Sequence, residues 1–389
     1  MFKTIFKNVL LIMFSSIIGF LLAEGLVRLF IASSNQWEII SETKGYKTST
    51  GNPYKFYDFD SELGWKNKSN YRGIFQRDEF KHEVTLNNER MRDKEVSRKK
   101  QKNKQRIAVM GDSFTWGVGV KDSERFTNII DKNNNNYEVL NFGVSGYGPL
   151  TYFLQLDNIL KFNPDIVLIA FCLGNDFSDN VFYRRYSYYG PFTVLSNNPK
   201  IEVHGYPLPQ VNEFYKNYQF IDLPLLKSIL KNSKLYSLIH SYLSREGYIK
   251  QKFYEHIHTQ LGHIGADEFQ RDIYYPNFQS ESSIYKDDMS FVNKKILSKI
   301  KDILVEKNIK FSVVVAPTKC EYGGCYIPYD YKNNNHARNL LLNNLKDLKI
   351  DYIDSTDSLT LKDFWEKDGH WRPSGHNKIA DGVLKWLSK

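Results

Sequence analysis

Cysteine is scarce in this sequence. The 389-residue chain contains three cysteines, which are too few for a scaffold held together by disulfides. Cys320 and Cys325 flank a Gly-Gly pair, and this spacing fits either a small disulfide-closed loop in an oxidising compartment or two free thiols. Cys172 lies inside an apolar run and is expected to be a buried free thiol.

Signatures of nucleotide, nucleic-acid and metal binding are also missing. The glycines between Gly111 and Gly119 match neither a phosphate loop nor a dinucleotide fingerprint, because no lysine stands at the required place. The formal net charge is +9, but the one dense basic stretch, 94–106, lacks interleaved aromatics and is typical of a solvated linker. His256, His258 and His263 have no Cys or carboxylate framework beside them. We therefore expect no nucleic-acid partner, no metal and no cofactor.

A long apolar segment is found at the amino terminus. Lys3 and Lys7 precede a stretch that begins at Val9 and meets no charge until Glu24. Residues 1–34 are therefore predicted to be an uncleaved signal anchor with a single transmembrane helix; a cleaved signal peptide is the alternative. The leading lysines predict that the amino end stays on the inner side of the cell membrane and that the rest of the chain is extracytoplasmic.

The remaining chain divides by its hydrophobic pattern. Residues 35–104 show no sustained period and are predicted to form a loop-rich extracytoplasmic arm. From 105 to 389, short apolar strands alternate with helices, which indicates a parallel sheet covered on both faces. The pattern pauses at about 177–290. This stretch is too long for a plain loop and is predicted to be an inserted helical lid or small subdomain.

Polar residues follow several of the predicted strands. Ser113, Gly146 and Asn175 each come just after a strand, and Asp368 and His370 stand in a loop before the last helix. The carboxyl ends of parallel strands meet at one edge of a sheet, so these residues are expected to converge. Together they supply a nucleophile, a base, an orienting carboxylate and oxyanion donors, which is the set needed for acyl transfer through a serine.

The same residues carry a resemblance to the SGNH/GDSL hydrolase superfamily. Its four sequence blocks look like Gly111-Asp112-Ser113-Phe114-Thr115-Trp116-Gly117, Asn141-Phe142-Gly143-Val144-Ser145-Gly146, Gly174-Asn175-Asp176 and Asp368-Gly369-His370-Trp371. The resemblance implies a flavodoxin-like three-layer α/β/α fold with a central parallel sheet. It also implies catalysis by Ser113, His370 and Asp368, with an oxyanion hole formed by the N–H groups of Ser113 and Gly146 and the side-chain amide of Asn175.

Some features leave alternatives open. The superfamily usually spaces its last pair as Asp-x-x-His, whereas this chain has Asp-x-His, a spacing similar to that of membrane-associated members of the alginate O-acetylation type. Asp363 or Glu366 is the alternative orienting carboxylate. Ser113 alone also fits a helix cap, and Gly146 and Asn175 also fit turn positions. His376, inside the last helix, is expected at the surface or in packing.

The expected function is that of a membrane-anchored, extracytoplasmic esterase or O-acyltransferase. Its substrate would be a small acyl ester, such as an acetyl ester, of a cell-envelope glycan. A membrane acyl-donor protein is a further possible partner. The alternative is a binding or assembly protein for an envelope polysaccharide that keeps the SGNH fold without turnover, a hypothesis motivated by the insertion and the altered Asp–His spacing.

Overall fold

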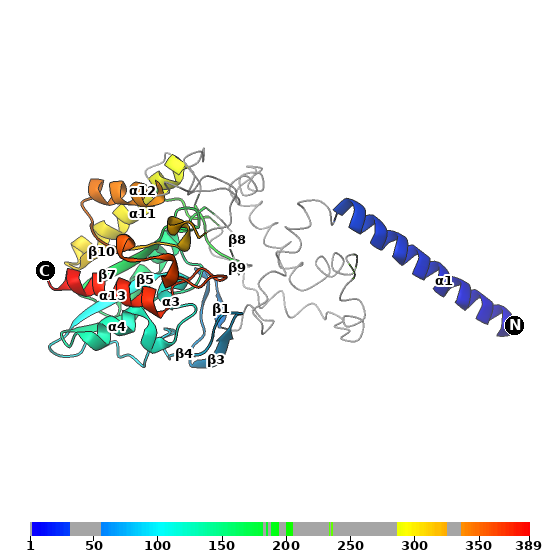
Figure 1. Ribbon diagram of the computed structural model, residues 1–389, viewed down its shortest axis with the longest axis horizontal. Coiled ribbons are helices and arrows are strands. Elements are labelled where there is room, and N and C mark those ends of the chain that lie inside the picture. Colours follow the sequence, from blue (N-terminus) through cyan, green and yellow to red (C-terminus); the bar gives the residue numbers. More distant parts are fainter. Residues whose placement is uncertain are drawn as a thin grey trace. The chain divides into compact units, whose positions relative to one another are not determined.

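The computed structural model describes residues 2–31, 56–181, 184–185, 188–193, 200–204, 233, 235, 286–324 and 336–389 (Figure 1). The chain divides into two compact units, Met1–Lys47 with Pro209–Thr259, and Thr48–Leu208 with Gln260–Lys389. Most of the predicted insertion, the three histidines at 256, 258 and 263, and Cys325 lie outside the described residues.

The first unit contains the predicted anchor segment. Helix α1 spans Phe2–Leu26 and continues into the π-helical turn η1, Val27–Ile31. Glu24 and Arg28 form an ion pair at 2.8 Å, one helical turn apart. Within the described ranges, no helix has both the length and the apolar character that a membrane crossing needs, so the predicted transmembrane helix is not confirmed.

A five-stranded parallel sheet forms the centre of the second unit. Its strands are β5 (Gln105–Gly111), β6 (Tyr137–Asn141), β7 (Ile166–Cys172), β10 (Lys310–Ala316) and β11 (Asp351–Asp354). They lie in the order β11-β10-β7-β5-β6. Numbered along the chain this order is 2-1-3-4-5, the flavodoxin-like arrangement, and it confirms the predicted α/β architecture.

Helices cover both faces of the sheet, as the continuous apolar strands predict. Side chains alternate between the faces along β5: Ile107 and Val109 pack in one core cluster, and Ala108 and Met110 pack in the other. The first cluster includes residues of α4 (Phe126–Asn133) and α13 (Pro373–Leu387). The second includes residues of α5 (Pro149–Leu160), α11 (Lys286–Glu306) and α12 (His336–Asp347).

Short elements connect these layers. The single-turn helix α3 (Ser113–Trp116) follows β5, and β8 (Arg184–Arg185) pairs with β9 (Tyr188–Tyr189). The 3₁₀ turns are η3 (Asp122–Glu124), η4 (Lys319–Tyr322), η5 (Thr356–Ser358) and η6 (Leu361–Asp363). Cys320, in η4, is disulfide-bonded, and Cys172 is a buried free thiol as predicted.

Two antiparallel hairpins precede the sheet and differ from the expected loop-rich arm. They are β1 (Tyr57–Asp60) with β2 (Gly64–Asn67), and β3 (Tyr71–Gln76) with β4 (Lys81–Leu86). Trp65, Phe75 and Val84 are buried and belong to the same core cluster as Ala108 of the sheet. β4 has the alternation of exposed and buried residues that is typical of a half-buried strand, so the sequence contains a strand signal that the expectation of a loop-rich arm missed.

Candidate active site

Ser113 lies at the turn between β5 and α3. Asp112 is the N-cap of α3, and its Oδ1 accepts the N–H of Phe114 at 2.9 Å. The capping role that Ser113 alone could have filled therefore belongs to its neighbour, and the Ser113 hydroxyl is available for other contacts. The Ser113 N–H occupies the first helical position, where an amide has no partner within the helix.

The structure brings Ser113, His370 and Asp368 into one hydrogen-bonded chain. The Ser113 Oγ lies 2.7 Å from His370 Nε2, and His370 Nδ1 lies 2.5 Å from Asp368 Oδ1. A carboxylate only accepts, so His370 Nδ1 carries the proton and its Nε2 is left to accept from the serine hydroxyl. This is the arrangement that activates a serine for nucleophilic attack.

The short Asp-x-His spacing works because its middle residue is a glycine. Gly369 has φ +86°, in the left-handed region that side chains rarely adopt. The turn folds the Asp368 carboxylate back onto His370, where Oδ1 also faces the His370 backbone N–H at 3.3 Å. The departure from Asp-x-x-His is therefore compensated by local backbone geometry.

Asp368 is held as an anion. Burial by itself raises the pKa of this carboxyl, but the hydrogen bond and charge of His370, together with the Arg77 guanidinium, outweigh burial and hold the pKa well below its usual range. Arg77 Nη1 donates to Asp368 Oδ2, the oxygen that does not face His370. An ionised Asp368 orients the imidazole, and it could stabilise an imidazolium if His370 took up a proton.

Arg77 and its neighbour Glu79 were not found by sequence reasoning. Both lie in the turn of the β3–β4 hairpin, inside the segment expected to be an arm. The Glu79 carboxylate accepts the backbone N–H of Asp368 at 2.9 Å. No local motif marks these residues, because their roles arise from contacts with a loop whose Asp368 lies 291 and 289 positions later in the sequence.

Further contacts fix the loop that carries His370. Trp371 is fully buried and its Nε1 donates to the Pro317 carbonyl, just after β10, at 3.0 Å. The Trp365 N–H donates to the His370 carbonyl at 2.9 Å. The Phe114 ring packs against the imidazole, with ring centres 4.8 Å apart. The loop is thereby attached to the carboxyl end of β10 and to the helix that begins at Ser113.

The other candidates for these roles have different surroundings. Asp363 is bound by Lys378 at 2.7 Å, and Glu366 is exposed. His376 is buried and stacks on Phe126, whose backbone N–H donates to His376 Nδ1 at 3.3 Å. Burial lowers the pKa of His376 well below its usual value, so it is a packing residue.

Gly146 follows β6 with φ +80°, a conformation that favours glycine. The loop before it is attached to the first hairpin, because Trp65 Nε1 donates to the Ser145 carbonyl at 2.9 Å. The Tyr147 hydroxyl donates back to the Trp65 carbonyl. Gly146 is thus a buried turn residue at the edge where β6 ends.

Asn175 follows β7, whose neighbour β5 leads to Ser113. It is a turn residue, since its carbonyl accepts the Asp179 N–H at 2.8 Å, and its side chain is fixed as well. Asn175 Nδ2 donates to Asp179 Oδ2 at 2.7 Å, and the side chain also hydrogen-bonds Asp112 beside the nucleophile. β5 and β7 flank the point where the strand order reverses, which is where doubly wound sheets place their ligands.

Two acids are buried beneath this edge. Burial raises the pKa of Asp112, and burial together with the charge of Asp112 raises the pKa of Asp176 well above its ordinary value. Asp176 Oδ2 accepts the Cys172 N–H at 2.9 Å, and the Tyr152 hydroxyl lies 3.3 Å from each carboxyl oxygen. These groups brace the ends of β5 and β7 rather than face a substrate.

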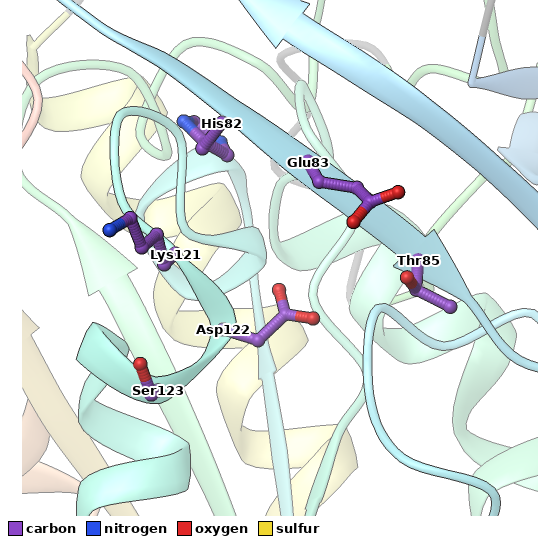
Figure 2. Close-up of a pocket in the computed structure, with 6 residues that line it drawn as sticks. All are labelled: His82, Glu83, Thr85, Lys121, Asp122 and Ser123. Atoms are coloured by element: carbon purple, nitrogen blue, oxygen red, sulfur yellow. The ribbon is translucent and has the colours of Figure 1, made fainter.

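A separate pocket lies between β4 and η3, away from the triad (Figure 2). It is lined by His82, Glu83, Thr85, Lys121, Asp122 and Ser123. None of the residues Ser113, His370 and Asp368 lines it. In the part of the chain that the structure describes, no group of three or more His, Cys, Asp or Glu side chains is placed to hold a metal.

Comparison with known proteins gives structural similarity only. No family model and no curated protein matches the chain. Among solved structures, an acetyl xylan esterase is 13% identical with TM-score 0.36, covering 72% of this chain and 99% of that one. A GDSL-like lipase from Bacteroides thetaiotaomicron is 10% identical with TM-score 0.35, covering 75% and 92%.

A member of the lipolytic G-D-S-L family from Veillonella parvula is 11% identical with TM-score 0.35, covering 73% of this chain and 99% of that one. At such identities and TM-scores the likeness by itself assigns no activity or substrate. Two of these solved proteins are described as GDSL-type.

Proposed function

We propose that this chain is a serine esterase or O-acyltransferase with Ser113 as its nucleophile. The observation that carries the proposal is the unbroken hydrogen-bonded chain from Ser113 Oγ through His370 to Asp368. A buried serine that only packs would not require a histidine fixed by an ionised carboxylate. The half-buried Ser113 also lies at the strand-order reversal of the sheet, where a substrate can reach it.

The reaction follows from these contacts. Ser113 Oγ attacks the acyl carbonyl while His370 Nε2 takes its proton, and Asp368 stabilises the resulting imidazolium. The tetrahedral oxyanion would accept hydrogen bonds from the N–H groups of Ser113 and Gly146. The Asn175 amide would join them once one of its two N–H bonds turns away from Asp112 or Asp179. His370 then gives its proton to the departing alcohol, which leaves an acyl-serine. Water resolves this intermediate in an esterase, and a sugar hydroxyl resolves it in a transferase.

The direct test is turnover of p-nitrophenyl acetate by the full chain and by Ser113→Ala. Loss of the nucleophile is expected to lower kcat by ~10³-fold or more. A fluorophosphonate probe should label the parent protein at Ser113. Equal turnover in both proteins would remove the catalytic assignment. A well-folded protein that neither turns over the ester nor takes up the probe would instead favour the non-catalytic binding protein.

The substrate class is the finer part of the proposal. We place a small acyl group, such as acetyl, on a cell-envelope glycan as the substrate, with an acyl-donor protein as a possible partner. Supporting it are the Asp-x-His spacing, similar to that of O-acetylation proteins, and the amino-terminal segment that would keep the site near envelope polymers. Incubation with acetylated and de-acetylated glycans, followed by mass spectrometry, separates a hydrolase, which removes acetyl, from a transferase, which adds it.

The location is proposed from the amino terminus. Lys3 and Lys7 before the apolar segment support an extracytoplasmic domain attached to the cell membrane. Fractionation of cells that express the full chain tests this. Recovery in the membrane fraction after a carbonate wash is expected, and recovery in the cytoplasmic fraction would contradict the proposal.

A further inference from the structure

We infer that the β3–β4 hairpin is a functional part of the active site, in which Arg77 is a positioning residue for Asp368 and Glu79 holds the loop that carries it. This inference rests on the proposed serine acyl transfer and adds residues that the four sequence blocks do not contain. The hairpin turn consists of Arg77, Asp78, Glu79 and Phe80, between the last strand pair, Gln76 and Lys81.

Arg77 contacts the carboxylate on the side opposite to the histidine. Its Nη1 donates to Asp368 Oδ2, while Asp368 Oδ1 accepts the hydrogen bond from His370 Nδ1. The Asp368 side chain is only 4% exposed and that of Arg77 is 26% exposed, so water has little access to this pair. A carboxylate bound at both oxygens has one orientation, and that orientation directs the His370 imidazole toward Ser113.

Glu79 fixes the backbone around Asp368. Its Oε2 accepts the N–H groups of Asp368 at 2.9 Å and of Lys367 at 2.7 Å, and its Oε1 accepts that of Glu366 at 2.9 Å. Three successive amides that would otherwise require water are bound by one side chain. Charged hydrogen bonds of this kind are about twice as strong as neutral ones.

The hairpin is rigid enough to position these groups. The Arg77 N–H donates to the Phe80 carbonyl at 2.9 Å and closes the turn. The Arg77 guanidinium lies over the Phe75 ring at 5.5 Å, which limits its rotamers. Phe80 is buried and packs on Trp365, at the start of the Asp368 loop, with ring centres 5.4 Å apart. The turn and the catalytic loop therefore move as one packed unit.

A positioning role predicts a loss in the chemical step with little loss in substrate binding. Small displacements of a catalytic group cost up to about 10²-fold in rate, so Arg77→Ala should lower kcat by this order while KM changes little. Arg77→Lys keeps the positive charge but lacks the planar guanidinium, so its kcat should lie between those of the parent protein and Arg77→Ala. Added ethylguanidinium should restore part of the kcat of Arg77→Ala, which a defect in folding would not allow.

The pH profile gives a second readout. Without Arg77 a positive charge beside the hydrogen-bonded Asp368–His370 pair is lost, so the pair takes up a proton at a higher pH. The acid limb of kcat/KM for Arg77→Ala should therefore move to higher pH. Glu79→Gln keeps the charge balance at Asp368 closer to the parent and should lower kcat with a smaller movement of this limb.

The same hairpin offers a matched control. Arg72 and Glu83 also pair across β3 and β4, but both side chains are more than half exposed, at 71% and 53%. Arg72→Ala and Glu83→Gln should leave kcat, KM and the pH profile unchanged. Ser113→Ala is included to separate the hairpin inference from the proposed serine mechanism. Full activity in that variant would contradict the serine mechanism itself.

The inference is overturned if Arg77→Ala and Arg72→Ala have the same kcat and the same acid limb while Ser113→Ala is inactive. It is equally overturned if the loss in Arg77→Ala lies in KM alone and ethylguanidinium restores nothing. If Arg77→Ala does not fold, as judged by near-UV circular dichroism, Arg77→Lys and Glu79→Gln carry the same test.

Discussion

The proposed nucleophile and the proposed acid–base pair are held in place in different ways. Ser113 is held by its immediate neighbours, because β5 ends at Gly111 and Asp112 caps the helix that Ser113 begins. Asp368, in contrast, is bound by a side chain 291 positions earlier in the chain. The difference teaches that a short motif can specify the position of the nucleophile, whereas the orientation of its partners depends on distant parts of the fold. Substitutions of residues that are distant in sequence but contact Asp368 should therefore lower kcat more than substitutions equally distant in sequence from Ser113.

The largest effect is expected at His370, which contacts both Ser113 and Asp368. His370→Gln should lower turnover of p-nitrophenyl acetate by ~10³-fold, since the general base is lost. Because Ser113 and His370 act as a unit, the double variant with Ser113→Ala should be no less active than either single variant. Initial rates of all three proteins test this. A multiplicative loss in the double variant would show that the two residues act independently.

A second effect is expected at Asn175, the proposed side-chain donor to the oxyanion. Asn175→Ala should lower kcat by about 10²-fold with little change in KM, because its amide would act only once the oxyanion forms. Asn158→Ala is the control, since this exposed residue on α5 contacts Lys161 at 2.7 Å and should not affect kcat. An unchanged kcat in Asn175→Ala would assign this residue to the turn alone.

A smaller effect is expected at Gly369, whose left-handed backbone forms the short Asp-x-His turn. Gly369→Ala forces a side chain into a left-handed backbone and should lower the free energy of unfolding by about 1–2 kcal/mol. Gly323→Ala is the matched control, since Gly323 has φ +76° and a β-carbon added there would meet no atom within 4 Å. Both variants should lose similar stability in urea titrations, but only Gly369→Ala should also lose kcat. Equal kcat in the two would show that the turn geometry is not needed for His370.

The last predictions concern the pH dependence of stability. The pKa of Asp368 is lowered on folding, so its stabilisation is complete above the ordinary aspartate pKa and is lost as the pH falls through the folded value. The pKa of Asp176 is raised, so its ionisation opposes folding as the pH rises above the ordinary value. At neutral pH, Asp368→Asn should lower the free energy of unfolding and Asp176→Asn should raise it.

Urea titrations at neutral and acidic pH measure both changes. The stability lost by the parent protein on acidification should be smaller in Asp368→Asn, because the titrating group is gone. A fall in stability for Asp176→Asn at neutral pH would show that its hydrogen bonds to Cys172 and Tyr152 require a carboxyl group.

Much of the sheet domain could be predicted from the sequence because its signals are local. Continuous apolar strands with intervening helices indicated the five parallel strands, and polar residues after β5 and β7 pointed to the edge where Ser113 and Asn175 lie. The hairpins were missed for the opposite reason. Apart from the alternation along β4, their signals are not local, because Trp65 and Phe75 show their purpose only when they pack against the sheet.

The sequence by itself determined the nucleophile segment, the strand–helix alternation and the candidate acid and base. Each of these depends on residues close together in the chain, where side-chain type and spacing dictate backbone conformation. Only the tertiary structure decided that Asp368, despite the short spacing, faces His370, and that Arg77 and Glu79 hold it there. The physical reason is that the charge state and orientation of a carboxylate depend on everything that surrounds it. For Asp368 two of those neighbours, Arg77 and Glu79, come from the other end of the domain.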